Sequence, residues 1–230
     1  MPVMKRILVV QCHSSPEWVE RERENFQRAI GTSAEVQFLS ALDERLAWST
    51  PDEFLAECDG VIFGGSYDFD FHGGRDQKDP ARVMALIILS RARNIVQHAE
   101  SKSIPILGVC FGHQLIAEMR GGEVRCDESQ GKTGSHEVAL TPEGAKDPLF
   151  RGFPASFVAQ YWHKDSVVHP PEGATLLASG PSCRFSALRY GDNVYTVQFH
   201  PETERIMVDE NPRPSPETSK LISVWLERFV

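Results

Sequence analysis

Short apolar runs alternate with longer amphipathic stretches along the first half of the chain. Continuous runs of aliphatic and β-branched residues are typical of buried parallel strands, and amphipathic stretches are typical of the helices that cover such a sheet. Strands are therefore predicted at residues 7–11, 34–38, 60–63 and 104–109. The pattern indicates an open α/β sheet.

Helices are predicted between these strands. Ser15 and Pro16 suit the N-cap and first turn of one helix. A second helix is predicted over residues 81–100, and a third from about residue 112 until two glycines end it at residues 121 and 122. The predicted apolar face of the second helix consists of Val83, Leu86, Ile87 and Ile95.

Short strands separated by turn signals dominate the second half of the chain. They are predicted at residues 137–140, 157–161, 175–178, 185–190 and 194–199, followed by a helix over 216–229. The fold class is thus a mostly parallel sheet flanked by helices, with additional antiparallel strands in its second half. No linker or repeat divides the chain, so residues 1–230 are expected to form a single domain.

The composition narrows the kinds of partner. The 230 residues carry a net charge of −8, and no basic run is longer than two residues, so a nucleic-acid partner is not expected. No apolar run is long enough for a signal peptide or a membrane span. Five cysteines at irregular spacing resemble neither a disulfide framework nor a zinc site, which favours a reducing cytoplasm. No HExxH or GxxxxGK[ST] motif is present, so neither a metal nor an organic cofactor is expected.

Cys110 lies where the strand over residues 104–109 meets the following helix, with Gly108 and Gly112 two residues away on either side. This spacing is that of the Gly-x-Ser-x-Gly nucleophile elbow, with cysteine in place of serine. A sharp turn of this kind needs small flanking residues, and the helix N-terminus puts a positive partial charge beside the sulfur. The Phe111 amide at the helix start could donate to an oxyanion. The alternative is a buried structural cysteine.

A thiol nucleophile needs an imidazole and a group that orients it. The predicted strand over 194–199 runs into His200-Pro201-Glu202. Positions two apart in an extended chain face the same way, so His200 and Glu202 can project together from the strand end. Carboxyl ends of strands are also where open α/β sheets build their sites. The alternative for an isolated histidine is an ordinary surface or core residue.

Four segments together resemble the class I (triad) glutamine amidotransferases, such as the glutaminase parts of GMP synthetase, carbamoyl phosphate synthetase and anthranilate synthase. GVCFGHQ at 108–114 is similar to the family's nucleophile motif, and QFHPE at 198–202 to its histidine–glutamate motif. FGGS at 63–66 is similar to its oxyanion strand, and YWHKDSV at 161–167 to a segment that lines the glutamine pocket. The resemblance covers nearly the whole chain and implies a flavodoxin-like fold.

The resemblance implies a role for each matching position. Cys110 would be the nucleophile, His200 the general base and acid, and Glu202 the orienting carboxylate. The amides of Gly65 and Phe111 would form the oxyanion hole. The residues implied to hold the amino-acid end of the substrate are Gln114 and His163.

One segment departs from the family pattern. The oxyanion strand of the family commonly continues with proline, whereas Ser66 follows the two glycines here. Residues 66–80 are distinctive and are expected to overhang the site as a lid or specificity loop, in which His72 and Asp76 could contact substrate. A surface insertion without a role is the alternative.

Three functions remain open from the sequence. The first is a glutaminase that releases ammonia from glutamine and passes it to a separate synthase. The second is a stand-alone hydrolase that cleaves γ-glutamyl amides or peptides through the same thioester. The third is a binding or regulatory protein without catalytic activity. The substrate in the first two cases is a small molecule.

Overall fold

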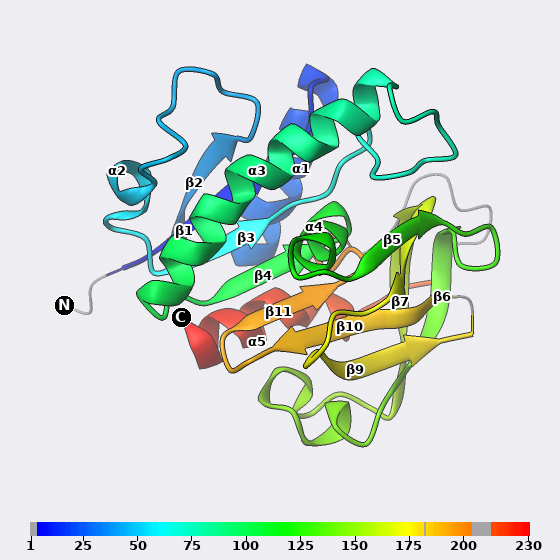
Figure 1. Cartoon of the computed structure of the whole chain (residues 1–230). Coiled ribbons are helices and arrows are strands. Elements are labelled where there is room, and N and C mark those ends of the chain that lie inside the picture. The colour runs from blue at the N-terminus through cyan, green and yellow to red at the C-terminus, as the bar shows by residue number, and fades with distance from the viewer. Residues whose placement is uncertain (1–3, 182, 204–212) are drawn as a thin grey trace.

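The protein is described by a computed structural model over residues 4–181, 183–203 and 213–230. These residues form a nine-stranded sheet with the order β2-β1-β3-β4-β11-β10-β9-β6-β7, and a separate pair, β5 and β8 (Figure 1). The strands are β1 (Lys5–Gln11), β2 (Ala34–Ser40), β3 (Gly60–Phe63), β4 (Ile106–Val109), β5 (Glu123–Cys126), β6 (Lys132–Leu140), β7 (Ser156–His163), β8 (Asp165–His169), β9 (Thr175–Gly180), β10 (Cys183–Tyr190) and β11 (Val194–Val197).

The first half of the sheet is parallel. β1 pairs in parallel with β2 and β3, β3 with β4, and β4 with β11. Successive side chains of β1 alternate between two cores: Ile7 and Val9 face one, while Leu8 and Val10 face the other. Both faces of the strand are thus buried, which is why its sequence is continuously apolar. The predicted fold class is confirmed.

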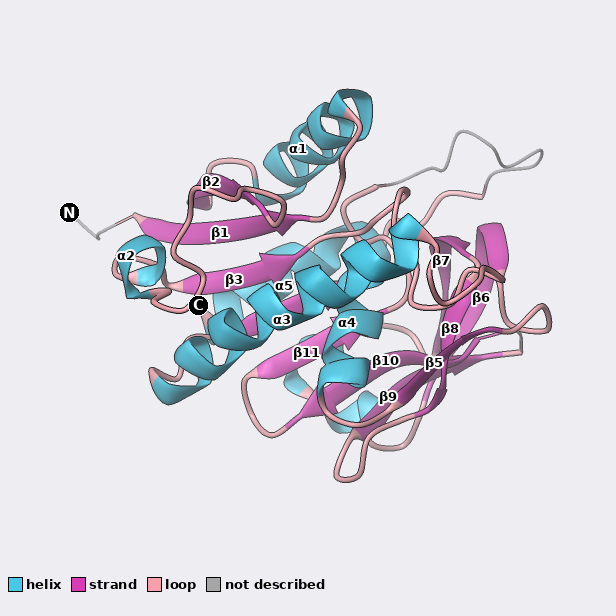
Figure 2. Cartoon of the chain, turned by 45° about the horizontal axis from the view of Figure 1, so that its top comes forward, coloured by secondary structure: helices cyan, strands magenta, loops and turns pink. Residues whose placement is uncertain are grey.

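Helices cover both faces of this parallel half (Figure 2). α1 (Pro16–Ile30) and α5 (Leu221–Phe229) pack against one core, and α3 (Pro80–Ser101) and α4 (Phe111–Met119) against the other. The short α2 (Asp52–Leu55) was not predicted. Ser15 is the N-cap of α1 as predicted, although its side chain makes no capping hydrogen bond.

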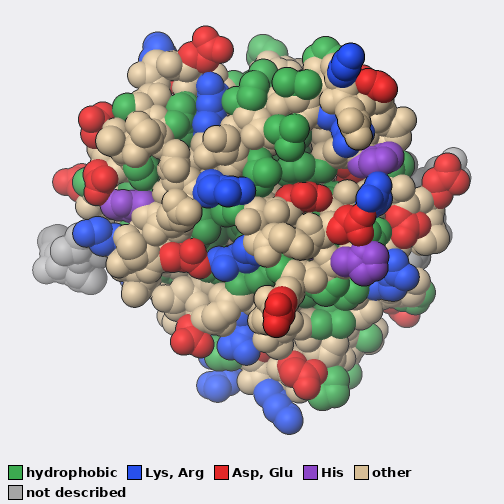
Figure 3. Space-filling model, in the orientation of Figure 1, with side chains coloured by type: hydrophobic (Ala, Val, Ile, Leu, Met, Phe, Trp, Pro, Cys, Tyr) green, Lys and Arg blue, Asp and Glu red, His purple; other side chains and the backbone are tan. Residues whose placement is uncertain are grey.

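The predicted apolar face of α3 was largely wrong. Ile95 is buried, but Val83, Leu86 and Ile87 are 44%, 58% and 39% exposed. The buried positions follow a different stripe, which consists of Ala85, Ile88, Ala92, Ile95, Val96 and Ala99. Small alanines on this stripe let the helix approach the sheet closely, so side-chain size was a misleading guide to the buried face. Figure 3 views the side of the molecule that α3 crosses, where hydrophobic side chains lie at the surface among charges of both signs.

The second half of the sheet is antiparallel, as predicted. β10 pairs with β11 and β9, and β6 with β9 and β7, all in antiparallel orientation. The antiparallel pair β5–β8 was missed, and β6 begins five residues before the predicted start at 137. The last helix was predicted from residue 216, whereas α5 begins at Leu221 after a 3-10 turn over Thr218–Lys220.

The antiparallel strands continue the same sheet that the parallel strands begin. We therefore propose that residues 1–230 form a single domain. Among the helices of the described residues, none combines the length and hydropathy needed to cross a membrane.

Candidate active site

Cys110 occupies a strained turn between β4 and α4. Its backbone dihedrals are φ 51° and ψ −100°, and Ser103 is the other non-glycine residue of the described ranges with positive φ. A residue with a Cβ atom adopts this conformation only at an energetic cost, and such strain concentrates at functional sites. The thiol is buried and lies 3.7 Å from the carbonyl oxygen of Trp162. The turn has the geometry expected of a nucleophile elbow.

The two flanking glycines are required by close packing of the backbone. A Cβ atom at Gly112 would lie 2.4 Å from the carbonyl oxygen of Phe63, and one at Gly108 would lie 2.8 Å from that of Gly112. Neither obstacle is a flexible side chain, so any larger residue would push β4, α4 and the end of β3 apart. The collision predicted from the Gly-x-Cys-x-Gly spacing is present.

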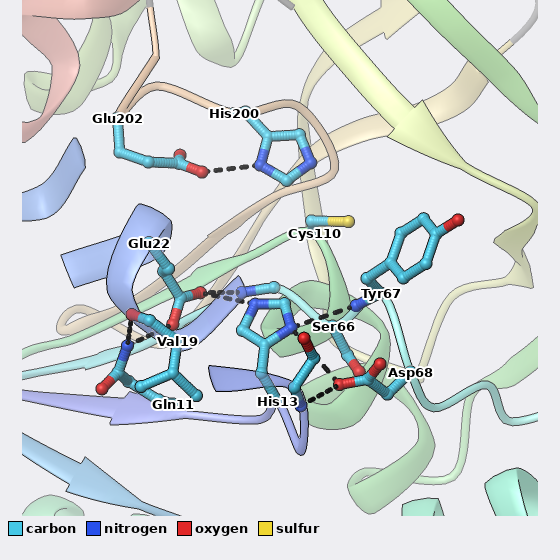
Figure 4. Close-up of polar contacts among 12 residues, drawn as sticks. Gln11, His13, Val19, Glu22, Ser66, Tyr67, Asp68, Cys110, His200 and Glu202 are labelled. Atoms are coloured by element: carbon cyan, nitrogen blue, oxygen red, sulfur yellow. Dashed lines mark hydrogen bonds and ion pairs between the residues drawn. The ribbon is translucent and has the colours of Figure 1, made fainter. Parts of the chain in front are cut away.

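His200 and Glu202 follow β11 and form a short hydrogen bond. Nδ1 of His200 is 2.6 Å from Oε1 of Glu202, and the carboxylate is buried (Figure 4). The His200 amide donates to the carbonyl oxygen of Gln160 at 2.8 Å, which fixes the backbone from which the ring projects. The chain that follows β11 therefore delivers both side chains to one place.

The structure brings this pair to Cys110. A Cβ atom built on Gly65 would lie 3.4 Å from Cε1 of His200 and 3.8 Å from Cβ of Cys110, so the two side chains flank the same point. Nε2 of His200 is buried and has no hydrogen-bond partner within the described ranges. β3, β4 and β11 are neighbours in the sheet, and their carboxyl ends carry Gly65, Cys110 and His200. This is the edge at which open α/β sheets build their sites.

The electrostatic surroundings of His200 favour its charged form. Burial alone would lower the pKa, but the Glu202 carboxylate and the Cys110 sulfur outweigh it and raise the pKa of His200 well above its usual value. His113 and His163 are also buried but have no carboxylate within hydrogen-bond reach among the described residues. Burial lowers the pKa of each to about 3.

The two amides expected to bind an oxyanion differ in their hydrogen bonding. The Phe111 N–H is the first amide of α4, where no intrahelical acceptor exists. The Gly65 N–H instead donates to Oε1 of Glu22 at 2.8 Å. A carboxylate therefore already occupies one of the two donors.

Glu22 belongs to a buried polar cluster that the sequence interpretation missed. Its Oε2 accepts a hydrogen bond from Nε2 of Gln11 at 3.2 Å, and its Oε1 lies 3.5 Å from Nε2 of His13. A signal was available in the sequence: Glu22 is four residues before Phe26 and eight before Ile30, and these three are the buried positions of α1. An acidic residue on the apolar stripe of a helix indicates a specific role.

Gln114 and His163 both lie beside the cysteine. Nε2 of Gln114 donates to the carbonyl oxygen of Asp165 at 2.7 Å, and Nδ1 of His163 is 2.9 Å from the same oxygen. Nε2 of His163 is buried without a partner within the described ranges. Both residues line the pocket that opens at Cys110.

The loop over residues 66–80 forms part of this pocket. Ser66, Tyr67, Phe69 and Asp70 line it, whereas His72 and Asp76, which were expected to contact substrate, are not among the lining residues. The amides of His72 and Gly73 donate to the Asp165 carboxylate at 2.7 Å each, which anchors the loop to β8.

One group of side chains in the described part of the chain has metal-ligand chemistry. His72, Cys126 and Asp165 each offer a ligand atom, and these atoms lie within 4.8 Å of one another. Because both Asp165 oxygens already accept amide hydrogen bonds, the group has a structural explanation without an ion.

Comparison of the sequence with models of protein families identifies the family of this chain. The model described as glutamine amidotransferase class-I matches residues 71–211, which is more than half of the chain. The chain belongs to this family. The resemblance that the four sequence motifs indicated is therefore confirmed at the level of the family.

Relatives of this class I glutamine amidotransferase are named for more than one activity. A glutamine-hydrolyzing GMP synthase subunit of Sulfolobus acidocaldarius is 36% identical over 161 residues, which cover 67% of this chain and 74% of that protein. Gamma-glutamyl peptidase 3 of Arabidopsis thaliana is 30% identical over 167 residues, which cover 70% of this chain and 61% of that protein.

The solved structures agree on the fold of this amidotransferase. A putative GMP synthase subunit from Thermoplasma acidophilum superposes with a TM-score of 0.70, and the match covers 99% of this chain and 94% of that one. The identity is 20%, so this likeness shows the fold alone.

Proposed function

We propose that the chain hydrolyses the γ-carboxamide of glutamine through a cysteinyl γ-glutamyl thioester. Cys110 is the nucleophile, His200 the general base and acid, and Glu202 the carboxylate that orients the ring. The observation that carries the proposal is the 2.6 Å His200–Glu202 hydrogen bond beside a cysteine held in a strained elbow. Membership of the amidotransferase family supports it.

The proposed reaction has two stages. His200 holds the proton of Cys110, and the sulfur attacks the γ-carbonyl carbon of glutamine. As the C–N bond breaks, His200 gives its proton to the departing ammonia and the thioester remains. His200 then takes a proton from water, the hydroxide attacks the thioester, and the sulfur leaves with the proton. The net change is glutamine plus water to glutamate plus ammonia.

The carbonyl oxygen gains negative charge in each stage. The Phe111 N–H is free to donate to it, while the Gly65 N–H must first give up its hydrogen bond to Glu22. An oxyanion donor of this kind is worth about 3 kcal/mol in the transition state. We infer that Gln114 and His163 help to bind the amino-acid end of the substrate, since both line the pocket next to Cys110.

Ammonia release from glutamine tests the proposal. Cys110→Ala is expected to abolish release, whereas the matched variant Cys126→Ala, at a half-exposed cysteine, is expected to retain it. Mass spectrometry of acid-quenched protein should detect one γ-glutamyl group on the wild type and none on Cys110→Ala. Ammonia release by Cys110→Ala at the wild-type rate would refute the assignment.

A second candidate is hydrolysis of larger γ-glutamyl amides by the same groups. It is favoured by the pocket, which extends past Cys110 to partly exposed aromatic side chains that an ammonia leaving group would not need. One of the relatives is named for peptidase activity on γ-glutamyl compounds. Comparison of glutamine with γ-glutamyl dipeptides as substrates of the purified chain separates the two candidates.

We also propose a partner and a compartment. Relatives named as one subunit of GMP synthase support a separate synthase that receives the ammonia. All five cysteines are free thiols, which fits a reducing compartment and supports a cytoplasmic location.

A further inference from the structure

Three aromatic rings from separate parts of the chain meet along one wall of the pocket. Trp18 comes from α1, Tyr67 from the loop after β3, and Trp162 from β7. The rings of Trp18 and Tyr67 stack with centroids 4.6 Å apart, and Trp162 meets them edge-on at 5.3 Å and 5.4 Å. We call these three residues the aromatic wall.

The aromatic wall begins at the nucleophile. The carbonyl oxygen of Trp162 is 3.7 Å from the Cys110 sulfur, and Tyr67 follows Gly65 by two residues. In Figure 4 the Tyr67 side chain lies on the same side as the Cys110 sulfur. The wall therefore lies next to the sulfur atom that would attack the substrate.

The wall retains exposed apolar surface. Tyr67 is 56% exposed, although it stacks on Trp18. Large aromatic surfaces that remain uncovered inside a pocket are typical of ligand-binding sites, because a planar ligand gains both apolar burial and stacking there. An ammonia molecule would use none of this surface.

A cation lies at the outer part of the wall. The guanidinium of Arg21 is 5.3 Å from the Trp18 ring centre and lines the same pocket. Arg21 forms no ion pair with any residue that the structure describes, whereas Arg23 on the same helix pairs with Glu20 at 3.5 Å. A planar guanidinium without a carboxylate suits a carboxylate on the ligand.

We propose that the aromatic wall and Arg21 bind the leaving group of the substrate, and that this leaving group is an aromatic amino acid. The substrate is then a γ-glutamyl dipeptide whose second residue is aromatic, with its ring on the wall and its free carboxylate toward Arg21. The inference rests on the proposed thioester chemistry. The amide C–N bond breaks as the C–S bond forms, His200 protonates the departing amine, and water then cleaves the thioester to release glutamate.

The first test compares substrates of the wild-type chain. γ-Glutamyl-phenylalanine and γ-glutamyl-tryptophan should be cleaved with kcat/KM at least about tenfold above γ-glutamyl-alanine, which has the same carboxylate but no ring. The amide of γ-glutamyl-phenylalanine, which lacks the carboxylate, should lose about tenfold relative to the acid. Equal kcat/KM for the phenylalanine and alanine dipeptides would overturn the inference.

The second test locates the preference on the wall. Trp18→Ala should reduce kcat/KM for γ-glutamyl-phenylalanine about tenfold more than kcat/KM for γ-glutamyl-alanine, and Trp18→Phe should restore most of this difference. The matched control is Trp48→Ala, since Arg91 lies over Trp48 at the same 5.3 Å but outside the pocket. An equal loss for both dipeptides in Trp18→Ala would contradict a leaving-group site.

Arg21 is tested in the same way. Arg21→Gln should remove the preference for the free acid over the amide of γ-glutamyl-phenylalanine, and Arg21→Lys should keep part of it. Arg28→Gln, at an exposed position of the same helix, is the control. Retention of the full preference in Arg21→Gln would show that the carboxylate binds elsewhere.

Failure of this inference and failure of the proposed function are distinguishable. Hydrolysis of glutamine that depends on Cys110, without preference for aromatic dipeptides, would overturn the aromatic-wall proposal alone. If nothing is hydrolysed, the thioester proposal fails. Binding of the dipeptides to Cys110→Ala, measured by calorimetry, still tests whether the aromatic wall is a ligand site. Tighter binding of γ-glutamyl-phenylalanine than of γ-glutamyl-alanine would support it, and equal binding would overturn it.

Discussion

Two pairs of glutamate and histidine flank Cys110, and they are built differently. On one side, His200 and Glu202 lie two residues apart in the chain that follows β11 and make a 2.6 Å hydrogen bond. On the other side, His13 follows β1, Glu22 belongs to α1, and their side chains are 3.5 Å apart. The same two residue types therefore stand on both sides of Cys110.

The difference lies in what each carboxylate binds. Oε1 of Glu202 bonds the ring of His200, whereas Oε1 of Glu22 accepts the Gly65 N–H at 2.8 Å and its Oε2 accepts from Gln11. A carboxylate that is hydrogen-bonded to an imidazole fixes the tautomer of the ring and stabilises its protonated form. A carboxylate bonded to a backbone amide anchors a loop. Geometry, and not residue type, separates the proposed catalytic pair from the anchoring pair.

Separate substitution of His200 and His13 is expected to give the largest difference in kcat/KM. His200→Asn should lower kcat/KM for the best substrate about 10⁴-fold or more, because Cys110 would lose its proposed general base. His13→Asn should stay within about tenfold of wild type, because its ring accepts a hydrogen bond from the Tyr67 amide and lies beside Glu22. Steady-state kinetics on folded proteins, checked by circular dichroism, measures both. Comparable losses in the two variants would remove the distinction between the pairs.

Glu202→Gln is expected to give the next largest effect. The amide can still bond Nδ1 of His200, but it no longer supplies the charge that raises the pKa of the ring. The rate should fall about 10²- to 10⁴-fold, as for an orienting carboxylate in other triads. The His200 pKa, followed by NMR of the labelled imidazole, should move down. An unchanged pKa would mean that Glu202 does not set the protonation of His200.

The sequence predicted that His200 and Glu202 lie together, but it did not predict the meeting of His13 and Glu22. His200 and Glu202 are two residues apart in the chain and follow a strand, so local alternation predicts that they project together. Cys110 is marked by flanking glycines that the elbow requires. His13 and Glu22 belong to separate elements, and their meeting with Gly65 depends on how α1 packs on the sheet, which local patterns do not specify.

The same reasoning explains which parts of the fold were predicted. The parallel strands are buried on both faces and have continuous apolar runs, so β1, β3 and β4 were found close to their true bounds. β5 and β8 each contain charged residues and pair only with each other, and they were missed. The exposed apolar residues of α3 were assigned to the core because the alanines that pack there give a weak hydrophobic signal.

His113 and His163 are buried, and within the described residues neither has a carboxylate in hydrogen-bond reach. The pH dependence of stability therefore distinguishes them from His200. Burial lowers the pKa of His113 and His163 to about 3, against about 6.5 when unfolded. Below pH 6.5 the unfolded chain takes up protons that the folded chain does not, so each residue should reduce the free energy of unfolding by about 1.4 kcal/mol per pH unit. His200 has the opposite sign: its raised pKa contributes stability at low pH that is lost as pH rises through the folded value.

Urea denaturation between pH 7 and pH 5 measures this slope. His113→Gln should make the slope shallower by about 1 kcal/mol per pH unit averaged over this range, since one proton-linked site is removed and the unfolded imidazole is only partly protonated near pH 6.5. Lys102→Gln is the control, because Lys102 is exposed. An unchanged slope in His113→Gln would show that this ring is not held neutral in the fold.

Glu22→Gln is expected to give the smallest effect on catalysis, and it tests the pair formed by His13 and Glu22. The Gly65 N–H currently donates to Oε1 of Glu22, so a carboxylate charge stands next to the place where the substrate oxygen would become negative. The neutral amide keeps an acceptor for Gly65 but removes this charge, so kcat should rise about two- to tenfold with little change in KM. Glu20→Gln on the exposed side of α1 is the control. A fall in kcat would show that the charge of Glu22 holds the loop in its working position. Both glutamates would then support catalysis, and the two pairs would differ only in their distance from the reacting atoms.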